Sequence, residues 1–206
     1  TGEDTLSLHD ALPICTGPVE IRGHLGELTS IAFMPDGKSL LTTSLDKTAR
    51  VSAVDGSGKT SVLSGHQGPV RYAAPSFDGA FVVTTSDDRT ARIHHSNGIG
   101  AQILFEGHDD AVVHAAWSPD GTRIVTTSLD KTVRNWPADG KSAPIVFSAD
   151  GMAMMSASFR KDGRYILTRS AERTIAVWPS SGGMPLRLEA HEGPVVAAAW
   201  SPDGKR

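Results

Sequence analysis

Histidine and aspartate recur together along the chain, at a spacing suited to hydrogen-bonded pairs. Three histidines each follow a glycine, and an aspartate lies 22 residues after each of them. The pairs are His24 and Asp46, His66 and Asp88, and His108 and Asp130. An imidazole can transfer protons, ligate a metal or satisfy a buried carboxylate, so the residue type alone does not choose between these roles.

Two other segments suggest ligand chemistry. Ala53–Thr60, with sequence AVDGSGKT, matches a loose phosphate-loop pattern. That chemistry requires a helix after the loop, whose N-terminal N–H groups hold phosphate. Here Ser61–Leu63 is a short apolar strand before Gly65, so we predict a plain turn and no nucleotide cofactor.

The remaining histidines do not form a metal site in this interpretation. His94 and His95 are adjacent, and neighbouring residues of a strand point to opposite faces. His114 lies within an apolar strand and is expected to be packed or to face a pore. No cysteine pair or nucleophile elbow accompanies them, so we predict no catalytic, cofactor-binding or metal-binding residues.

Composition excludes further classes of partner. The chain of 206 residues has 20 Lys and Arg against 23 Asp and Glu, and the two signs are mixed. This balance predicts no nucleic-acid partner. The longest apolar run, Val195–Trp200, is too short to cross a bilayer, so no membrane partner is expected.

The first 15 residues are set apart from the domain. Residues 5–14, TLSLHDALPI, resemble a translated sequencing adapter, and we interpret residues 1–15 as an artefactual or disordered tail. No targeting segment is visible, which favours a cytoplasmic location. Cys15 is the sole cysteine, so it cannot form an internal disulfide.

Residues 16–206 are organised by a repeat. Units begin at about residues 23, 65, 107, 149 and 190, at intervals of 42, 42, 42 and 41 residues. Asp-Gly turns and a Ser-x-Asp/Glu-x-Thr triplet keep the same phase. In the third unit, the segments at 111–117, 122–127, 132–136 and 144–147 are short and rich in β-branched residues. Each unit is therefore predicted to be four antiparallel strands.

The most complete unit, Gly107–Trp136, resembles the WD-repeat β-propeller family, and the likeness covers nearly all of residues 19–206. It implies an all-β fold, a β-propeller of four-stranded antiparallel blades. About four and a half blades are present, so we expect an incomplete ring and a fragment of a longer protein.

The resemblance also implies a structural tetrad of His, Ser or Thr, Asp and Trp in each blade. Carried onto this sequence, its members are His24, Ser44, Asp46, His66, Ser86, Asp88, His108, Ser128 (or Thr127), Asp130, Trp136, Ser170 and Trp178. Such a tetrad satisfies a buried carboxylate and a buried indole together, so the histidines stabilise the fold.

Several blades depart from that pattern. Ser52 and His94 stand where Trp136 and Trp178 stand in later units. In the fourth unit, Asp150 replaces the histidine and Glu172 the aspartate, so we do not expect its tetrad to form. Arg50, Arg92 and Arg134 recur on the third strand and are interpreted as packing residues.

Partners of WD-repeat proteins commonly bind the top face of the ring. The corresponding partner-binding residues are Glu27, Leu45, Arg71, Asp87, Val113, Leu129 and Met155. The predicted function is a non-catalytic scaffold that binds other proteins. One alternative is a sensor or regulatory propeller of a larger bacterial signalling protein with a kinase, NTPase or protease-like effector. Another is a propeller hydrolase whose catalytic residues lie in further blades.

Overall fold

The computed structural model describes residues 20–148, 151–188 and 192–204, and these form sixteen strands with no helix among them. The tail predicted at residues 1–15 lies outside this part of the chain. Within it, no helix is long and apolar enough to cross a membrane.

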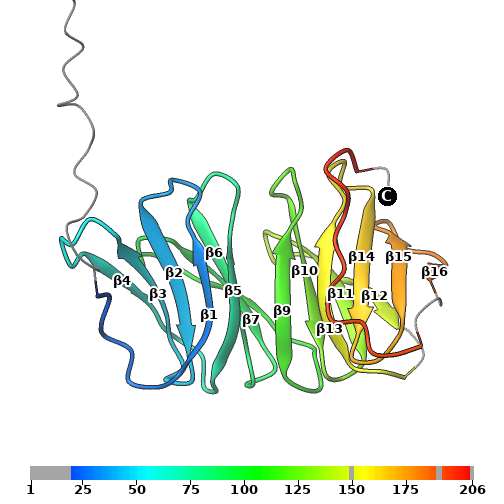
Figure 1. Ribbon diagram of the computed structural model, residues 1–206, viewed down its shortest axis with the longest axis horizontal. Coiled ribbons are helices and arrows are strands. Elements are labelled where there is room, and N and C mark those ends of the chain that lie inside the picture. The colour runs from blue at the N-terminus through cyan, green and yellow to red at the C-terminus, as the bar shows by residue number, and fades with distance from the viewer. Residues whose placement is uncertain (1–19, 149–150, 189–191, 205–206) are drawn as a thin grey trace, which may run out of the picture.

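The strands form four sheets of four antiparallel strands, here called blades one to four in chain order (Figure 1). Blade one contains β1 (Leu28–Phe33), β2 (Ser39–Ser44), β3 (Ala49–Ala53) and β4 (Thr60–Leu63). Blade two contains β5 (Val70–Pro75), β6 (Phe81–Ser86), β7 (Ala91–His95) and β8 (Ile103–Phe105). Blade three contains β9 (Val112–Trp117), β10 (Arg123–Ser128), β11 (Thr132–Pro137) and β12 (Ile145–Ser148). Blade four contains β13 (Met154–Phe159), β14 (Tyr165–Ser170), β15 (Ile175–Pro179) and β16 (Leu186–Leu188). The predicted all-β, blade-like fold is confirmed.

The Asp-Gly turns join the first two strands of each blade. In blade three the Gly121 N–H donates to the carbonyl of Ser118 at 2.9 Å, and Thr122 N–H donates to the Asp120 carboxylate at 3.0 Å. Gly121 has φ of 69°, a conformation that glycine adopts without steric penalty. The aspartate side chain and the glycine backbone therefore fix this reversal together.

The second turn of each blade, here called the tight turn, joins its second and third strands. Lys131 donates its backbone N–H to the Ser128 carbonyl at 3.3 Å and has φ of 74°. Lys47 and Arg89 occupy the same place in blades one and two, with φ of 72° and 70°. This left-handed residue closes the short loop between the second and third strands of blades one to three.

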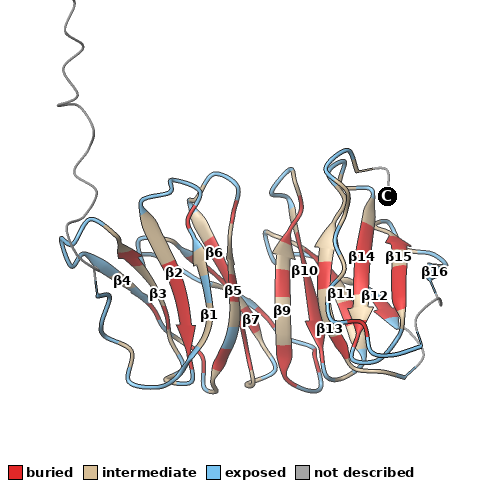
Figure 2. Cartoon of the chain, in the orientation of Figure 1, coloured by how far each residue is buried: buried red, intermediate tan, exposed pale blue. Residues whose placement is uncertain are grey.

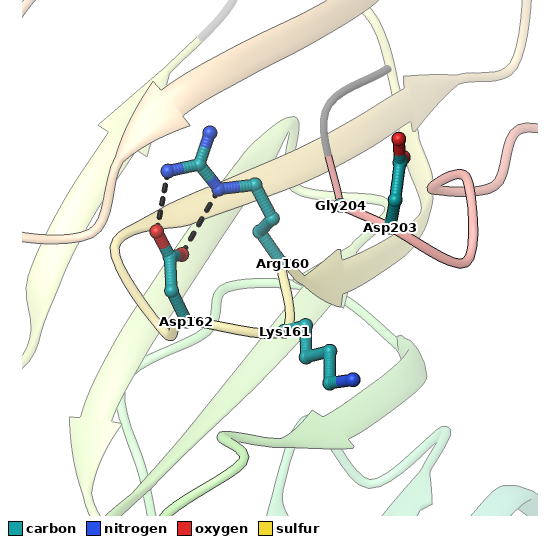
Figure 3. Close-up of a pocket in the computed structure, with 5 residues that line it drawn as sticks. All are labelled: Arg160, Lys161, Asp162, Asp203 and Gly204. Atoms are coloured by element: carbon teal, nitrogen blue, oxygen red, sulfur yellow. Dashed lines mark hydrogen bonds and ion pairs between the residues drawn. The ribbon is translucent and has the colours of Figure 1, made fainter.

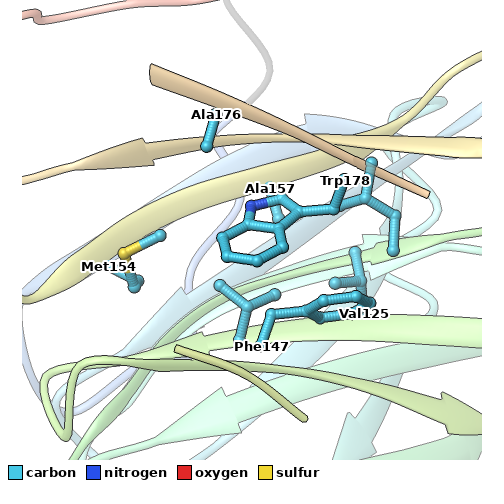
Figure 4. Packing of buried hydrophobic residues seen from close by; sticks show 8 residues of the cluster. Val125, Phe147, Met154, Ala157, Ala176 and Trp178 are labelled. Atoms are coloured by element: carbon cyan, nitrogen blue, oxygen red, sulfur yellow. The ribbon is translucent and has the colours of Figure 1, made fainter. Parts of the chain in front are cut away.

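Blades pack face to face through apolar side chains. Between blades three and four, Val125 and Phe147 contact Met154, Ala157 and Trp178 (Figure 4). The Phe147 and Trp178 rings lie 5.2 Å apart, centroid to centroid. Equivalent clusters join blade one to blade two and blade two to blade three. Because each sheet is apolar on both faces, the blades stabilise one another. Burial follows the middle of the strands, while the turns are exposed (Figure 2).

The first strand of each blade is here called the inner strand. A small residue on the inner strand lets each of blades two to four approach the preceding blade. Ala73, Ala115 and Ala157 lie 42 residues apart and are at most 2% exposed. In blade one the same position is Ile31, which is 64% exposed, as is Phe33. The face of blade one that corresponds to these covered faces is therefore open among the described residues.

Residues 192–204 lie against blade four, where Figure 1 draws them in red beside β13 and β14. The Trp200 indole N–H donates to the Ser158 carbonyl at 3.3 Å, and Val195 packs on Leu167 and Ile175. Trp117 makes the equivalent bond to Ala74 of blade two at 3.1 Å. The partial fifth unit thus docks as the inner part of a blade.

Candidate functional site

The hydrogen-bond network of blade three runs through four side chains. Trp136 Nε1–H donates to Thr126 Oγ1 at 2.9 Å, and Thr126 Oγ1 lies 2.8 Å from His108 Nε2. His108 Nδ1 lies 2.7 Å from Asp130 Oδ2. This network joins strands β10 and β11 to the loop that contains His108 and to the tight turn that contains Asp130.

The carboxylate end of this network is fully satisfied. Asp130 also accepts backbone N–H bonds from Asp109 at 3.0 Å and Thr132 at 2.8 Å, and the Thr132 hydroxyl at 2.7 Å. Partial burial raises the pKa of Asp130, but bonds from Thr132, His108 and Asp109 outweigh it and lower the pKa to about 2. Burial lowers the pKa of His108 against the opposing effect of Asp130. A neutral imidazole therefore donates Nδ1–H to an ionised carboxylate.

The hydroxyl in the network corrects the sequence prediction. It belongs to Thr126, not to Ser128 or Thr127. Ser128 Oγ instead donates to the Asp110 carbonyl at 3.0 Å and accepts the Asp130 N–H at 3.0 Å. Ser128 is thus engaged by the tight turn itself, whereas Thr126, two residues earlier on the same face of β10, reaches the imidazole.

The same correction applies to the other blades. Thr42 and Thr84 contact His24 and His66 in place of the predicted serines. Ser44 and Ser86 accept the N–H of the turn aspartate, each at 3.1 Å, and Ser170 accepts the N–H of Glu172 at 3.3 Å.

Blade two replaces the tryptophan by a second histidine. His66 Nδ1 lies 2.9 Å from Asp88, and His66 Nε2 lies 2.8 Å from Thr84 Oγ1. His94 Nε2 reaches the same hydroxyl at 3.0 Å, as the indole of Trp136 does in blade three. Burial, with the charges of His66 and Arg92, lowers the pKa of His94 to about 4. Neutral His94 is therefore the structural counterpart of tryptophan.

Blade one keeps the histidine end and lacks the aromatic end. His24 lies 2.8 Å from Asp46 and 2.9 Å from Thr42. Ser52 bonds to Thr60 at 3.0 Å instead of joining them. A cavity of about 460 Å³, lined by His24, Ile31 and Ser52 among others, opens on this face.

Blade four keeps the aromatic end. Trp178 Nε1–H donates to Thr168 Oγ1 at 3.0 Å. Asp150 of the predicted two-carboxylate contact lies outside the described residues.

The glycine before each histidine leaves room for an arginine. Gly107 has φ of 137°, and a Cβ there would lie 2.9 Å from Arg134 Nη1. The Arg134 guanidinium lies 5.8 Å from the Trp136 ring centroid. Arg50 and Arg92 approach Gly23 and Gly65 in the same way, which supports a packing role for the three arginines.

The phosphate-loop pattern does not have the structure it would need. Thr60 begins strand β4, and no helix follows it among the residues that the structure describes. His94 is buried and His95 is exposed. Within residues 20–148, 151–188 and 192–204, no group of three or more His, Cys, Asp or Glu side chains is arranged to hold a metal ion.

The predicted partner-binding residues lie at one end of the blades, here called the top face. The N–H of the residue before the turn aspartate bonds to the residue just before the inner strand. Leu45 bonds to Glu27 at 3.0 Å, and equivalent bonds involve Asp87, Leu129 and Ala171.

A β-bulge supplies the third member of each set. In blade three, Val112 pairs with Ser128 and His114 with Thr127, so Val113 is the extra residue. Arg71 and Met155 are the extra residues of blades two and four. Bulges redirect side chains, so this one turns a residue of the inner strand toward the top face.

Exposure differs among these residues. Leu45 and Leu129 are each 37% exposed, and Val113 and Met155 are half-buried. Arg71 forms a bidentate ion pair with Asp87, with Nε–Oδ1 of 2.7 Å and Nη2–Oδ2 of 2.6 Å. These two charges largely neutralise each other, so the surface combines apolar residues with a paired polar spot.

A polar cavity that sequence inspection missed lies at the opposite end. It has a volume of about 470 Å³ between the Asp-Gly turns of blade four and the fifth unit (Figure 3). Arg160 pairs with Asp162 there, and Asp203 and Gly204 form the far wall. Two of the earlier Asp-Gly turns have a proline where blade four has Lys161, and this added charge is the only sign of the cavity in the local sequence.

The comparisons with known proteins agree with this geometry. The family model WD40, described as WD domain, G-beta repeat, matches residues 16–51, 57–95 and 101–137, together more than half of the chain. A search of curated proteins gives no match.

Proposed function

Because the chain belongs to the WD40 repeat family, we propose that it binds other proteins through its top face and performs no catalysis. WD40 repeats typically serve as non-catalytic interaction modules. The finer assignment is to Glu27, Leu45, Arg71, Asp87, Val113, Leu129 and Met155.

One observation carries this proposal. In all four blades the β-bulge residue of the inner strand lies at the same end as the residue before the tight turn, whose backbone N–H donates to the carbonyl two positions before the bulge. The backbone is thus constant while the side chains vary: threonine, arginine, valine and methionine at the bulge, and leucine, aspartate, leucine and alanine before the turn. A constant frame with variable residues is suited to specific recognition.

The histidine networks support the non-catalytic part of the proposal. His66 and His108 are 1% and 2% exposed at their side chains, and each is bonded at both ring nitrogens. A buried imidazole held between a carboxylate and a threonine meets no substrate. Its role is to hold the loop that begins the inner strand.

Quantitative affinity capture tests the top face. Leu129→Ala and Arg71→Ala should each weaken partner binding by about tenfold, the effect of losing a central anchor. Leu104→Ala is the matched control, because Leu104 is 40% exposed and lies on outer strand β8. Undiminished capture by both top-face variants, or an equal loss in the control, would contradict the assignment.

In the signalling alternative, the same propeller is part of a larger protein that also contains an effector domain. A propeller that regulates an attached kinase, NTPase or protease-like effector would use the same face against that effector. Sequencing the complete gene, followed by activity of any attached effector with and without Leu129→Ala, distinguishes an independent scaffold from a regulatory domain.

A further inference from the structure

A second polar feature lies between the inner strands of blades three and four, which contact each other at β9 and β13. His114 and Thr127 are cross-strand partners. His114 Nδ1 and Thr127 Oγ1 are both buried, and neither has a hydrogen-bond partner among the described residues. Buried polar atoms are normally hydrogen-bonded, so these two atoms remain available to bind a small polar group between the blades.

The equivalent atoms of blades one and two have partners. In blade one, Ser30 Oγ and Thr43 Oγ1 lie 2.7 Å apart. In blade two, Thr85 Oγ1 lies 3.5 Å from the Tyr72 carbonyl. The unsatisfied pair is therefore specific to blade three and is not a property of the repeat.

A cavity of about 100 Å³ adjoins His114 of this pair. His114, Ser156, Ser158 and Arg169 line it, and the Tyr72 ring stacks on the imidazole at 4.2 Å between centroids. Liquid water occupies about 30 Å³ per molecule, so the volume holds about three waters or one compact ion.

The charge in the cavity wall is positive. Thr43, Thr85 and Thr127 occupy one position of the second strand, and blade four has Arg169 there. Arg169 Nη1 donates to the Val195 carbonyl at 2.9 Å. Within the part of the chain that the structure describes, no carboxylate forms an ion pair with Arg169. Burial and the charge of Arg169 lower the pKa of His114 to about 4, so the imidazole adds no second charge at neutral pH.

We propose that this cavity binds a compact oxyanion, a carboxylate or phosphate group, held by Arg169 with Ser156 and His114. Two N–H groups of an arginine can bond two oxygens of a carboxylate or phosphate at once, and hydroxyl and imidazole N–H groups also donate to such oxygens. The site lies one residue along the chain from Val113 and Met155, so a group bound there is adjacent to the proposed interface. Its existence does not depend on that interface.

Titration of the full chain with acetate and with phosphate tests the site. Each is added at constant ionic strength against chloride, and amide and imidazole NMR signals are followed. We expect saturable shifts at His114, Ser156 and Arg169. Arg169→Thr, which installs the residue of the other blades, should weaken binding by about tenfold or more, the loss of a charged hydrogen bond.

The controls separate a site from general charge effects. Arg164→Thr removes an exposed arginine of the same blade and should leave binding unchanged. If Arg169→Thr fails to fold, Ser156→Ala retains the charge and should weaken binding a few-fold. Saturation by acetate alone identifies a carboxylate site, and saturation by phosphate alone a phosphate site. Shifts equal to those with chloride, or unchanged binding in Arg169→Thr and Ser156→Ala, would overturn the proposal.

Discussion

The networks of blades one and three share a histidine, a threonine and an aspartate in nearly the same geometry. They differ at the third-strand position that Trp136 occupies in blade three and Ser52 in blade one. Trp136 of blade three is 6% exposed and packs on Phe105 of blade two at 5.5 Å between ring centroids. Ser52 of blade one has no aromatic ring to offer a neighbour, and the nearby Leu28, Ile31 and Phe33 are 57% to 64% exposed.

The difference separates two functions of the network. The His–Thr–Asp part forms in both blades, so it depends on the loop and the tight turn within one blade. The tryptophan connects that part to the preceding blade. The network of blade three is therefore tied both within its blade and to the preceding blade, whereas the described network of blade one is tied only within its blade, although blade one also packs on blade two.

The largest effect is expected when blade three is given the residue of blade one. Trp136→Ser should reduce the free energy of unfolding by about 3–5 kcal/mol, the range for removing a buried large aromatic side chain. Denaturant unfolding followed by the remaining tryptophans measures it. Ser52 is itself 2% exposed and bonds to Thr60, so Ser52→Ala in blade one should cost only about 0.5–1.5 kcal/mol, the value of that hydrogen bond. Equal effects of the two substitutions would contradict the distinction between the blades.

The second-largest effect is expected from acid, which should weaken the hydrogen bonds that the network aspartates accept. The pKa values of Asp88 and Asp130 are both about 2 in the folded chain, below the ordinary 3.8. Because folding depresses them, their stabilisation is complete above about pH 4 and is lost as the pH falls toward 2. The two together should contribute on the order of 2–4 kcal/mol after solvent screening.

Unfolding in urea at pH 7, 4 and 2.5 measures this loss. Asp130→Asn removes one of the two carboxylates and should give a shallower fall in stability between pH 4 and 2.5. A fall of the same size in the variant would show that Asp130 does not titrate as described.

A smaller effect distinguishes the two hydroxyls of β10. Thr126→Val removes the hydroxyl between His108 and Trp136 and should lower stability by about 1–3 kcal/mol, since it leaves buried groups unpaired. Ser128→Ala should cost about 0.5–1.5 kcal/mol, the value of an ordinary hydrogen bond. A larger loss from Ser128→Ala would restore serine to the network.

Sequence inspection found the blades because their markers recur in fixed phase. The Ser-x-Asp-x-Thr triplet encodes the tight turn, and the threonine of the network lies two residues before that triplet, so the triplet does not predict it. Thr42, Thr84, Thr126 and Thr168 recur with the same 42-residue spacing, so the signal was present. The β-bulge, the Arg71–Asp87 pair and the cavity beside His114 depend on side chains from separate strands, and no local pattern encodes them.

A double-mutant cycle between His108 and Trp136 tests most directly whether the four side chains act as one network. The variants are His108→Ala, Trp136→Phe and their combination, and unfolding free energies are compared. Trp136→Phe removes the indole N–H while retaining an aromatic ring. We predict a coupling of about 0.5–3 kcal/mol, transmitted through Thr126. Additivity within about 0.3–0.5 kcal/mol would contradict a connected network and leave only separate contacts.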